Sequence, residues 1–354
     1  MKYSYKTHYF NLFILFLLNL ISHFLPFERA AVGADDFSFL VDESQGLKHF
    51  LYNPDRPLQF IWFEFQNIII GDNSNIGIYY IFFFTFFTII ASYILFFLIL
   101  DSKKQSLLFS IIYTLIFNKI EIYHAPVYIF INLASTLYIF SLIFFISFIK
   151  IKKLYFLFLS FIFYGISILW YEVGFFIPLA MVAYLLIFEK KQITFKNISL
   201  FFPFFIILFS YSIYRATGAF GYVENFAGRQ INLLTLPFGL LEVFNTFFGK
   251  YFIKNMIYGI YVFLSLGIFW IVILLIINIF VLFSLNDLLN KIKIIKFHSK
   301  TLIFFSILFI VTIIPNILVG SLASRNIIIS SIPYVILIYI IINIFRSYKN
   351  NIIL

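Results

Sequence analysis

The sequence contains no cysteine, and acidic and basic residues together make up only 11% of its 354 residues. The absence of cysteine excludes disulfides, thiolate nucleophiles, iron–sulfur clusters and cysteine-ligated zinc. The scarcity of charge excludes an ordinary soluble domain, in which about 25% of residues are charged. No glycine-rich phosphate loop, HExxH motif, GxSxG motif or solenoid repeat is present, so nothing in the sequence indicates a soluble nucleotide-binding domain.

What the sequence has in abundance is apolar surface. Hydrophobic residues make up 63% of the chain, and 54 residues are phenylalanine. A water-facing globule cannot bury that much apolar surface, so the bilayer is the expected solvent. The sequence therefore predicts an all-α, polytopic membrane protein, a single membrane domain over residues 1–354 with about ten transmembrane helices, within a range of roughly nine to eleven.

The expected spans are the long apolar segments. They lie near residues 8–27, 76–100, 106–118, 125–149, 154–170, 172–188, 197–214, 256–284, 301–319 and 327–345. The third is too short to cross a hydrocarbon core of about 30 Å without tilting or thinning. The apolar segment 57–70 is also short and contains Glu64, so we expect it to lie along the membrane surface.

The polar connectors between these segments alternate in charge. One set holds 16 of the 25 basic residues and three acids, and the other holds nine basic residues and twelve acids. The positive-inside rule then predicts that both termini lie in the cytoplasm of a cell (inner or plasma) membrane. The net charge of +10 is thus an orientation signal, and nucleic acid is not an expected partner. A signal peptide cleaved after Ala34 is the alternative for the first segment, but its length favours an uncleaved span.

Two long connectors are expected on the outer face, over residues 28–75 and 215–255. Arginine is concentrated on that face, whereas fifteen of the nineteen lysines lie on the inner side. The outer arginines are Arg29, Arg56, Arg215, Arg229 and Arg325. Because a guanidinium grips phosphate or carboxylate at two points, this asymmetry indicates a phosphorylated or acidic ligand. Pairing of these arginines with the outer acids is the alternative interpretation.

The first outer connector contains the stretch GADDFSFL, with Asp35 and Asp36 side by side. A carboxyl group held at the membrane boundary and partly desolvated has a raised pKa, which suits a general base. The pattern requires no cofactor, although two adjacent carboxylates also offer oxygen ligands for a divalent cation such as Mg²⁺ or Mn²⁺. A solvated loop or a helix N-cap is the alternative.

Glu172, in WYEVGFFIPLA, lies between two apolar runs. A charged group at bilayer depth costs about 2.5–3.5 kcal/mol on insertion scales, so Glu172 is expected to bind a ligand or to pair with an arginine. His124, in NKIEIYHAP, is a candidate ligand for a phosphate or hydroxyl, with a satisfied interface histidine as the alternative. Arg215 ends the seventh segment, where it can reach a phosphate. Tyr214 and Tyr222 beside it line a sugar site or belong to the interfacial aromatic belt.

Three stretches together resemble a known family. The acidic pair in the first outer loop is followed by RPLQFIWFEFQ from Arg56, and WYEVGFFIPLAMVAYLLIFEK places a Glu before a Gly and then a Pro inside an apolar segment that ends in charged residues. This order is similar to that of integral-membrane glycosyltransferases of the GT-C type. The resemblance covers roughly residues 8–190, and the remainder matches only in being hydrophobic.

The resemblance implies a reaction. Such enzymes take a sugar from a polyprenyl-phosphate donor on the outer leaflet and transfer it to a glycan or lipid acceptor, with an aspartate as general base. Carried over, Asp35 or Asp36 would be the base, Arg56 would position the loop or bind phosphate, and Glu172 would be a second acidic group in the cavity. Arg215, Arg229 and Arg325 are candidates for phosphate stabilisation from the arginine asymmetry alone.

Two other functions fit parts of the pattern. A transporter or flippase for a lipid-linked sugar would also need outer arginines and an intramembrane Glu172, but transporters usually show inverted repeats, and none is visible here. A polymerase or ligase of surface polysaccharide would be expected to concentrate its acids in a late loop. Here the acids are concentrated early, and residues 215–255 contain only Glu224 and Glu242.

Overall fold

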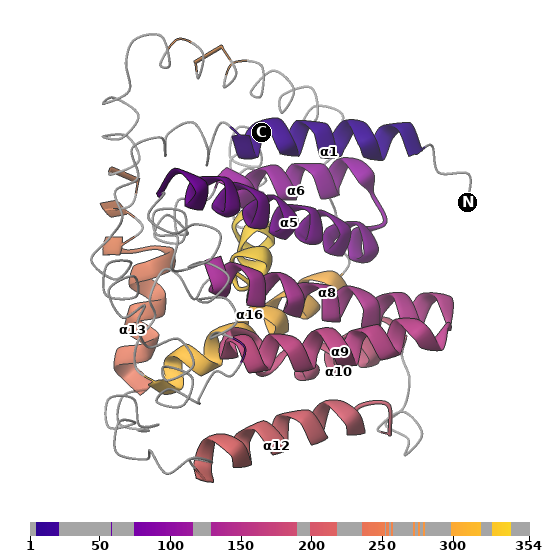
Figure 1. Ribbon diagram of the computed structural model, residues 1–354. Helices are drawn as coiled ribbons and strands as arrows, with labels where there is room; N and C mark the ends of the chain where they lie inside the picture. The colour runs from indigo at the N-terminus through magenta and orange to yellow at the C-terminus, as the bar shows by residue number, and fades with distance from the viewer. Residues whose placement is uncertain are drawn as a thin grey trace, which may run out of the picture.

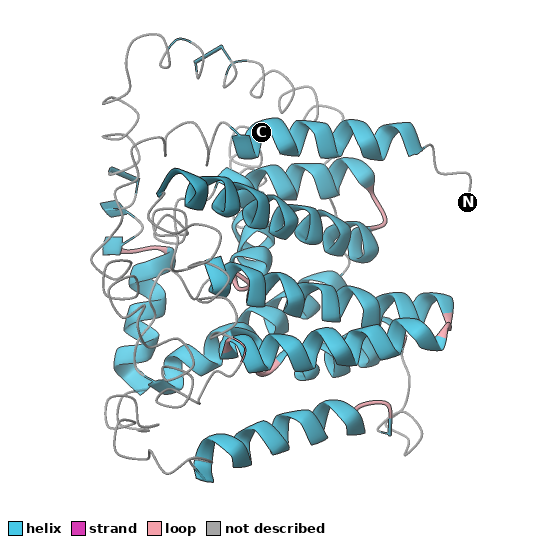
Figure 2. Cartoon of the chain, in the orientation of Figure 1, coloured by secondary structure: helices cyan, strands magenta, loops and turns pink. Residues whose placement is uncertain are grey.

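The protein is known from a computed structural model, which describes residues 5–20, 58, 74–115, 129–189, 199–217, 236–251, 299–319 and 328–340, together with the single residues 253, 254, 256, 257, 272, 275, 276 and 279. Within these ranges all regular secondary structure is helical, and no strand occurs (Figure 2). The expectation of an all-α chain is therefore confirmed for the described residues.

The helices follow the apolar segments of the sequence closely. They are α1 (Tyr5–Asn19), α5 (Ser74–Leu100), α6 (Lys103–Leu115), α8 (Ile129–Ile151), α9 (Leu154–Trp170), the 3₁₀ helix η6 (Glu172–Gly174), α10 (Ile177–Phe188), α12 (Phe202–Thr217), α13 (Leu236–Phe247) and α16 (Ser299–Val319). A further helical stretch covers Ser331–Ile340. One helix was not expected, because α13 lies inside the connector 215–255.

Two of the described helices are long and apolar enough to cross a membrane by length and composition, at Tyr79–Leu100 and Ile131–Ile151. Six further helical stretches of the described residues are apolar but shorter, with 10–17 residues each. A helical chain with two span-length helices gives a weak indication of membrane association. The prediction of about ten spans goes beyond what these two helices show.

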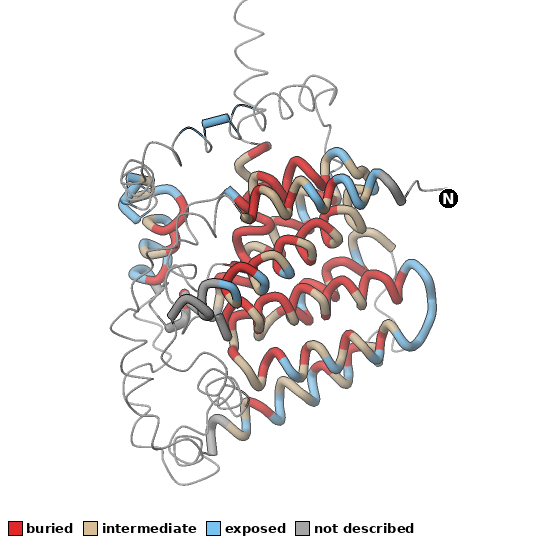
Figure 3. Tube along the Cα trace, turned by 45° about the horizontal axis from the view of Figure 1, so that its top comes forward, coloured by how far each residue is buried: buried red, intermediate tan, exposed pale blue. Residues whose placement is uncertain are grey.

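The bundle is built from antiparallel neighbours joined by short turns. Residues Asp101 and Ser102 join α5 to α6, and Lys152 and Lys153 join α8 to α9. Figure 1 shows both turns at the same end of the bundle, where α1 begins. Helix α8 packs between α5 and α9, and α12 packs on the outside of α9. Buried side chains form one continuous core along α5, α8, α9 and α10 (Figure 3).

Small polar side chains join the central helices. At the interface of α5 and α8, the Thr88 hydroxyl lies 2.6 Å from both Asn132 Oδ1 and Thr136 Oγ1, and all three residues are buried. Between α8 and α9, Ser141 and Ser160 each donate a hydrogen bond to the other's carbonyl oxygen, at 2.8 and 2.7 Å. Such interhelical bonds satisfy polar groups that an apolar surrounding would leave unpaired.

Helix α1 is held to the bundle by specific polar contacts. Asn11 donates to the Tyr93 hydroxyl at 3.0 Å, and His8 Nδ1 lies 2.9 Å from the same oxygen. At the other end of α1, Asn19 donates to the carbonyl oxygen of Phe82 at 3.0 Å. Because these contacts occur at both ends, α1 runs antiparallel to α5 along its whole length, as a packed member of the bundle.

One end of the bundle contains a cluster of charged residues. The Lys150 ammonium donates a hydrogen bond to the carbonyl oxygen of Leu98 near the end of α5, and Asp101 and Glu189 lie close enough to interact with its charge. Helix α16 begins at this end too, because Phe304 packs on Tyr184 and Phe188 near the end of α10. The structure thus brings together helix ends that adjoin four connectors assigned to the inner face by the sequence.

Candidate functional site at the end of helix α9

The site is built on the reversal of the chain between α9 and α10. Helix α9 ends at Trp170, and Tyr171 takes an extended conformation with φ −165° and ψ 140° while its N–H still bonds the carbonyl of Ser167. The single 3₁₀ turn of Glu172–Gly174 follows, and α10 then begins with Pro178 in its first turn. Proline lacks an N–H that a first turn would leave unpaired, so the sequence itself sets where α10 starts.

Glu172 is the carboxylate of this reversal, and it is only half-buried. The Tyr211 hydroxyl, from the last part of α12, donates a hydrogen bond to Glu172 Oε1 at 2.9 Å. Tyr211 is 5% exposed, so this hydrogen bond is shielded from solvent on the tyrosine side. A charge-assisted hydrogen bond of this kind lowers the cost of holding a carboxylate beside an apolar core.

Two tyrosines, one on α9 and one on α8, hold the reversal in place. The hydroxyl of Tyr164 donates to the carbonyl oxygen of Phe175 at 2.8 Å, which satisfies a carbonyl that the turn would otherwise orphan. The ring of Tyr138, on α8, lies directly against Gly174, where an added Cβ would approach Tyr138 Cγ to 2.3 Å. Only glycine fits at this position, which gives a physical reason for the Gly two residues after Glu172 in WYEVG.

The reversal also contacts the first long connector. The N–H of Leu58 donates to the carbonyl oxygen of Leu169 at 3.3 Å, in the last turn of α9. Leu58 is the leucine of the RPL stretch, two residues after Arg56 in the sequence. Leu58 of the first motif therefore contacts the helix turn that directly precedes the second motif, residues 170–178.

Of the candidate site residues, the structure describes two. Glu172 lies at the reversal, and Arg215 lies on α12 four residues, or about one turn, after Tyr211. Both therefore belong to the end of the bundle opposite the charged turns. Asp35, Asp36, Arg56, His124, Arg229 and Arg325 lie outside the described residues, as do most of segment 57–70 and the greater part of segment 256–284.

Sequence reasoning missed Tyr211 as the partner of Glu172. It considered Tyr214 and Tyr222, both close to Arg215, whereas the structure uses the tyrosine one turn earlier. Tyr214 packs beside Tyr211, with ring centroids 6.4 Å apart. With 24 tyrosines in the chain, no pattern distinguished Tyr211. The usable signal was Glu172 itself, because a carboxylate between apolar runs requires a donor from a neighbouring helix.

The arrangement suits recognition of a polar ligand beside an apolar one. The reversal contains the half-buried carboxylate of Glu172, to which the Tyr211 hydroxyl of α12 donates. The indole of Trp170, two residues earlier in the sequence, has an Nε1 that is buried without a hydrogen-bond partner in the described part of the chain. Such groups hydrogen-bond hydroxyls and pack on sugar or lipid faces. Among the described residues, no group of three or more His, Asp or Glu side chains is placed to hold a metal ion.

Comparison with known proteins identified no relative of this chain. No family model, no curated protein and no solved structure matches this chain.

Proposed function

We propose that this chain is a polytopic membrane glycosyltransferase, which moves a sugar from a polyprenyl-phosphate donor to a glycan or lipid acceptor at the outer face of a cell membrane. The observation that supports it best is the site at the end of α9. There the half-buried Glu172 is hydrogen-bonded to Tyr211 of α12, and Leu58 of the RPL stretch bonds the carbonyl oxygen of Leu169 in the last turn of α9. A residue of the first motif thus lies against the helix end that leads into the second, although more than a hundred residues separate them in the sequence.

Helix lengths support a site at membrane depth. Helix α9 starts directly after Lys152 and Lys153, and its 17 residues extend about 26 Å at 1.5 Å per residue. Helix α10 ends directly before Glu189, and its 12 residues extend about 18 Å. With their charged ends at the inner boundary, both helices stop short of a core of about 30 Å, so the Glu172 reversal would lie below the outer boundary.

A carboxylate below the membrane boundary is accessible to a lipid-borne substrate and shielded from bulk water. The sugar phosphate of a polyprenyl-phosphate donor lies at the adjoining lipid–water interface, because the polyprenyl chain anchors it in the bilayer. In this proposal Glu172 and Tyr211 bind hydroxyls of the sugar or the acceptor. Arg56, Arg215, Arg229 and Arg325 stabilise the phosphate, and His124 assists in binding it.

The proposed reaction is a displacement at the anomeric carbon. Asp35 or Asp36 takes the proton of the acceptor hydroxyl, and the hydroxyl oxygen forms a bond to the anomeric carbon. The bond between that carbon and the phosphate oxygen breaks, and the polyprenyl phosphate leaves with the electron pair. The arginines offset the negative charge that develops on the leaving oxygen, and a divalent cation, where present, would share this role.

The experiment uses membranes that contain the wild type, Asp35→Asn or Asp36→Asn at equal protein level. Each is incubated with radiolabelled polyprenyl-phosphate sugars and a mixed acceptor pool, with and without a chelator. We expect the wild type to consume donor and one asparagine variant to lose at least about a hundredfold in rate, as general-base loss typically does. Unchanged turnover in both variants, or movement of labelled lipid without cleavage, contradicts the proposal, and the latter result favours a flippase.

A further inference from the structure

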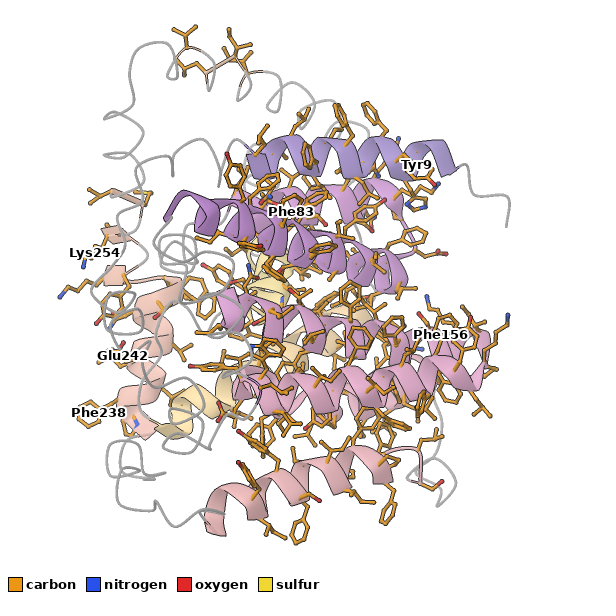
Figure 4. All side chains as sticks on the ribbon, in the orientation of Figure 1. Tyr9, Phe83, Phe156, Phe238, Glu242 and Lys254 are labelled. Carbon is orange, nitrogen blue, oxygen red and sulfur yellow. The ribbon has the colours of Figure 1, made fainter. Side chains whose placement is uncertain are left out.

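Helix α13 runs in a different direction from α5, α8, α9 and α12. Figures 1 and 3 show it running across the end of the bundle, while α5, α8, α9 and α12 run along the bundle axis. In Figure 4, Phe238, Glu242 and Lys254 follow one another along that end. A helix that crosses the ends of spanning helices lies roughly parallel to the membrane plane.

One face of α13 is firmly packed. At Gly239 the helix touches the backbone of α16, where an added Cβ would meet the Ile317 carbonyl oxygen at 2.5 Å. Val243 and Phe247 complete this face in a small core with Ile313, Ile317 and Tyr334. The Tyr334 hydroxyl also donates to the carbonyl oxygen of Phe247. These contacts fix the position and rotation of α13. Its other face therefore points away from the bundle.

That outward face is apolar. It is formed by Phe238, Leu240, Leu241, Phe244 and Phe248, which are 48–66% exposed. Their spacing of three and four residues places them on one side of the helix, with the half-buried Glu242 at its border. Apolar area left in water costs about 25 cal/mol per Å², so five such side chains on one face require an apolar covering.

The position of α13 decides what that covering is. Helix α13 packs on Ile313 and Ile317 of α16, which come 14 and 18 residues after the start of α16 at Ser299, or about 21 and 27 Å along its axis. With Ser299 at the inner boundary, both contacts lie just inside a hydrocarbon core of about 30 Å, close to its outer boundary. Two exposed cations, Lys250 and Lys254, follow α13 and can reach lipid phosphates from that depth. An apolar face with cations at its end matches a bilayer interface.

We propose that α13 is an interfacial membrane helix, with Phe238, Leu241, Phe244 and Phe248 among the acyl chains of the outer leaflet and Lys250 and Lys254 at the phosphates. The inference rests on the membrane placement in the proposed function and is independent of the transfer reaction.

The chain has no cysteine, so single-cysteine variants of the full-length protein carry one label each. Spin labels are attached at Phe238→Cys, Leu241→Cys, Phe244→Cys and Phe248→Cys in liposomes of phosphatidylcholine and phosphatidylglycerol. Their depth is read from collisions with oxygen and with a water-soluble nickel complex. The control set is the exposed face of α12, at Phe202→Cys, Phe205→Cys, Phe209→Cys and Ile213→Cys. Lys254→Cys is the aqueous control on the α13 side.

We expect the four α13 labels to share one shallow depth within about 5 Å, whereas depth along α12 changes by roughly 16 Å over its eleven-residue interval. A membrane-impermeant maleimide should modify Phe244→Cys at least about tenfold more slowly than Lys254→Cys. Water-exposed α13 labels, a depth gradient of about 15 Å along α13, or spin–spin broadening between two copies would each overturn the inference. Water-exposed α12 labels would overturn the membrane placement itself, and the inference with it.

Discussion

The two ends of the bundle differ in how they handle charge. At the end with the turns of Asp101–Ser102 and Lys152–Lys153, lysines extend from short connectors, and Lys150 caps the carbonyl of Leu98. At the opposite end, the reversal after α9 contains a half-buried carboxylate, Glu172, which is held by the hydroxyl of the buried Tyr211. The first arrangement suits anchors, which need only to reach water. The second holds a charge in a fixed geometry, which is what binding and catalysis require.

The largest expected effect comes from comparing a substitution at Glu172 with substitutions at the lysines of the other end. Glu172→Gln keeps the volume of the side chain but removes its charge, so we expect transfer to fall by about a hundredfold or more if Glu172 binds reacting groups. Lys152→Gln and Lys153→Gln, at the anchor end, should change the rate less than about twofold. The measurement is donor turnover at equal protein level. Equal losses at the two ends would show that Glu172 has no special role.

Gly174→Ala tests whether the reversal around Glu172 is as tightly built as its contacts indicate. The new Cβ would approach the Tyr138 ring to 2.3 Å, and we expect the free energy of unfolding to fall by about 1–3 kcal/mol. Gly165→Ala, on α9, is the matched control, because its Cβ would meet Ile207 Cδ1 at an ordinary 3.7 Å. Thermal melts in detergent compare the two variants. A Gly165→Ala loss as large as that of Gly174→Ala would refute the tight fit.

Tyr211→Phe tests how much a single hydrogen bond contributes to the Glu172 site. The substitution removes the hydroxyl that donates to Glu172 but keeps the ring that packs beside Tyr214 and Phe175. We expect a loss of about 1.5–3 kcal/mol in donor binding or unfolding free energy, as for other hydrogen bonds to a charged group. Tyr214→Phe should have a smaller effect on both. A double variant of Tyr211→Phe with Glu172→Gln should lose less than the sum of the two single losses, since Glu172→Gln already removes the charge that strengthens the shared hydrogen bond.

The smallest expected effect concerns the middle of the bundle, which lies between the two ends. Ser160→Ala removes a hydroxyl that donates to the Ser141 carbonyl, in a pair of reciprocal bonds between α8 and α9. Interhelical bonds in bundles within lipid average about 0.6 kcal/mol, so the melting temperature should fall only slightly and transfer should be unchanged. A large loss of activity here would indicate that the site depends on the middle of the bundle.

Much of the helical framework was predictable from the sequence, because charged residues separate the apolar segments. Residues 154–170 form α9 as predicted, since Lys152 and Lys153 end the previous run and Tyr171 begins the turn. Helix α13 was missed because its 12 residues contain Pro237 and Gly239 and are too short for a span. Its apolar stripe was readable, but a search for long apolar runs passes over a helix that packs one face and exposes the other.

The site was predictable only in part. Glu172 was singled out because a carboxylate between apolar runs is costly unless it is used or paired. Its partner Tyr211 and the contact between Leu58 and Leu169 depend on how α9, α12 and the first connector pack, which is information carried by many residues at once. The role of Gly174 was likewise invisible before the Tyr138 ring was placed against it. The role of Asp35 or Asp36 as the general base stays a prediction.

The most direct test of the central claim uses purified protein in liposomes that contain a radiolabelled polyprenyl-phosphate sugar and a water-soluble glycan acceptor. The wild type should release polyprenyl phosphate and label the acceptor, and Glu172→Gln should do so at least about a hundredfold more slowly while Lys153→Gln matches the wild type. Label that crosses the bilayer with its sugar–phosphate bond intact, or equal rates for the wild type and Glu172→Gln, would contradict a transferase centred on Glu172.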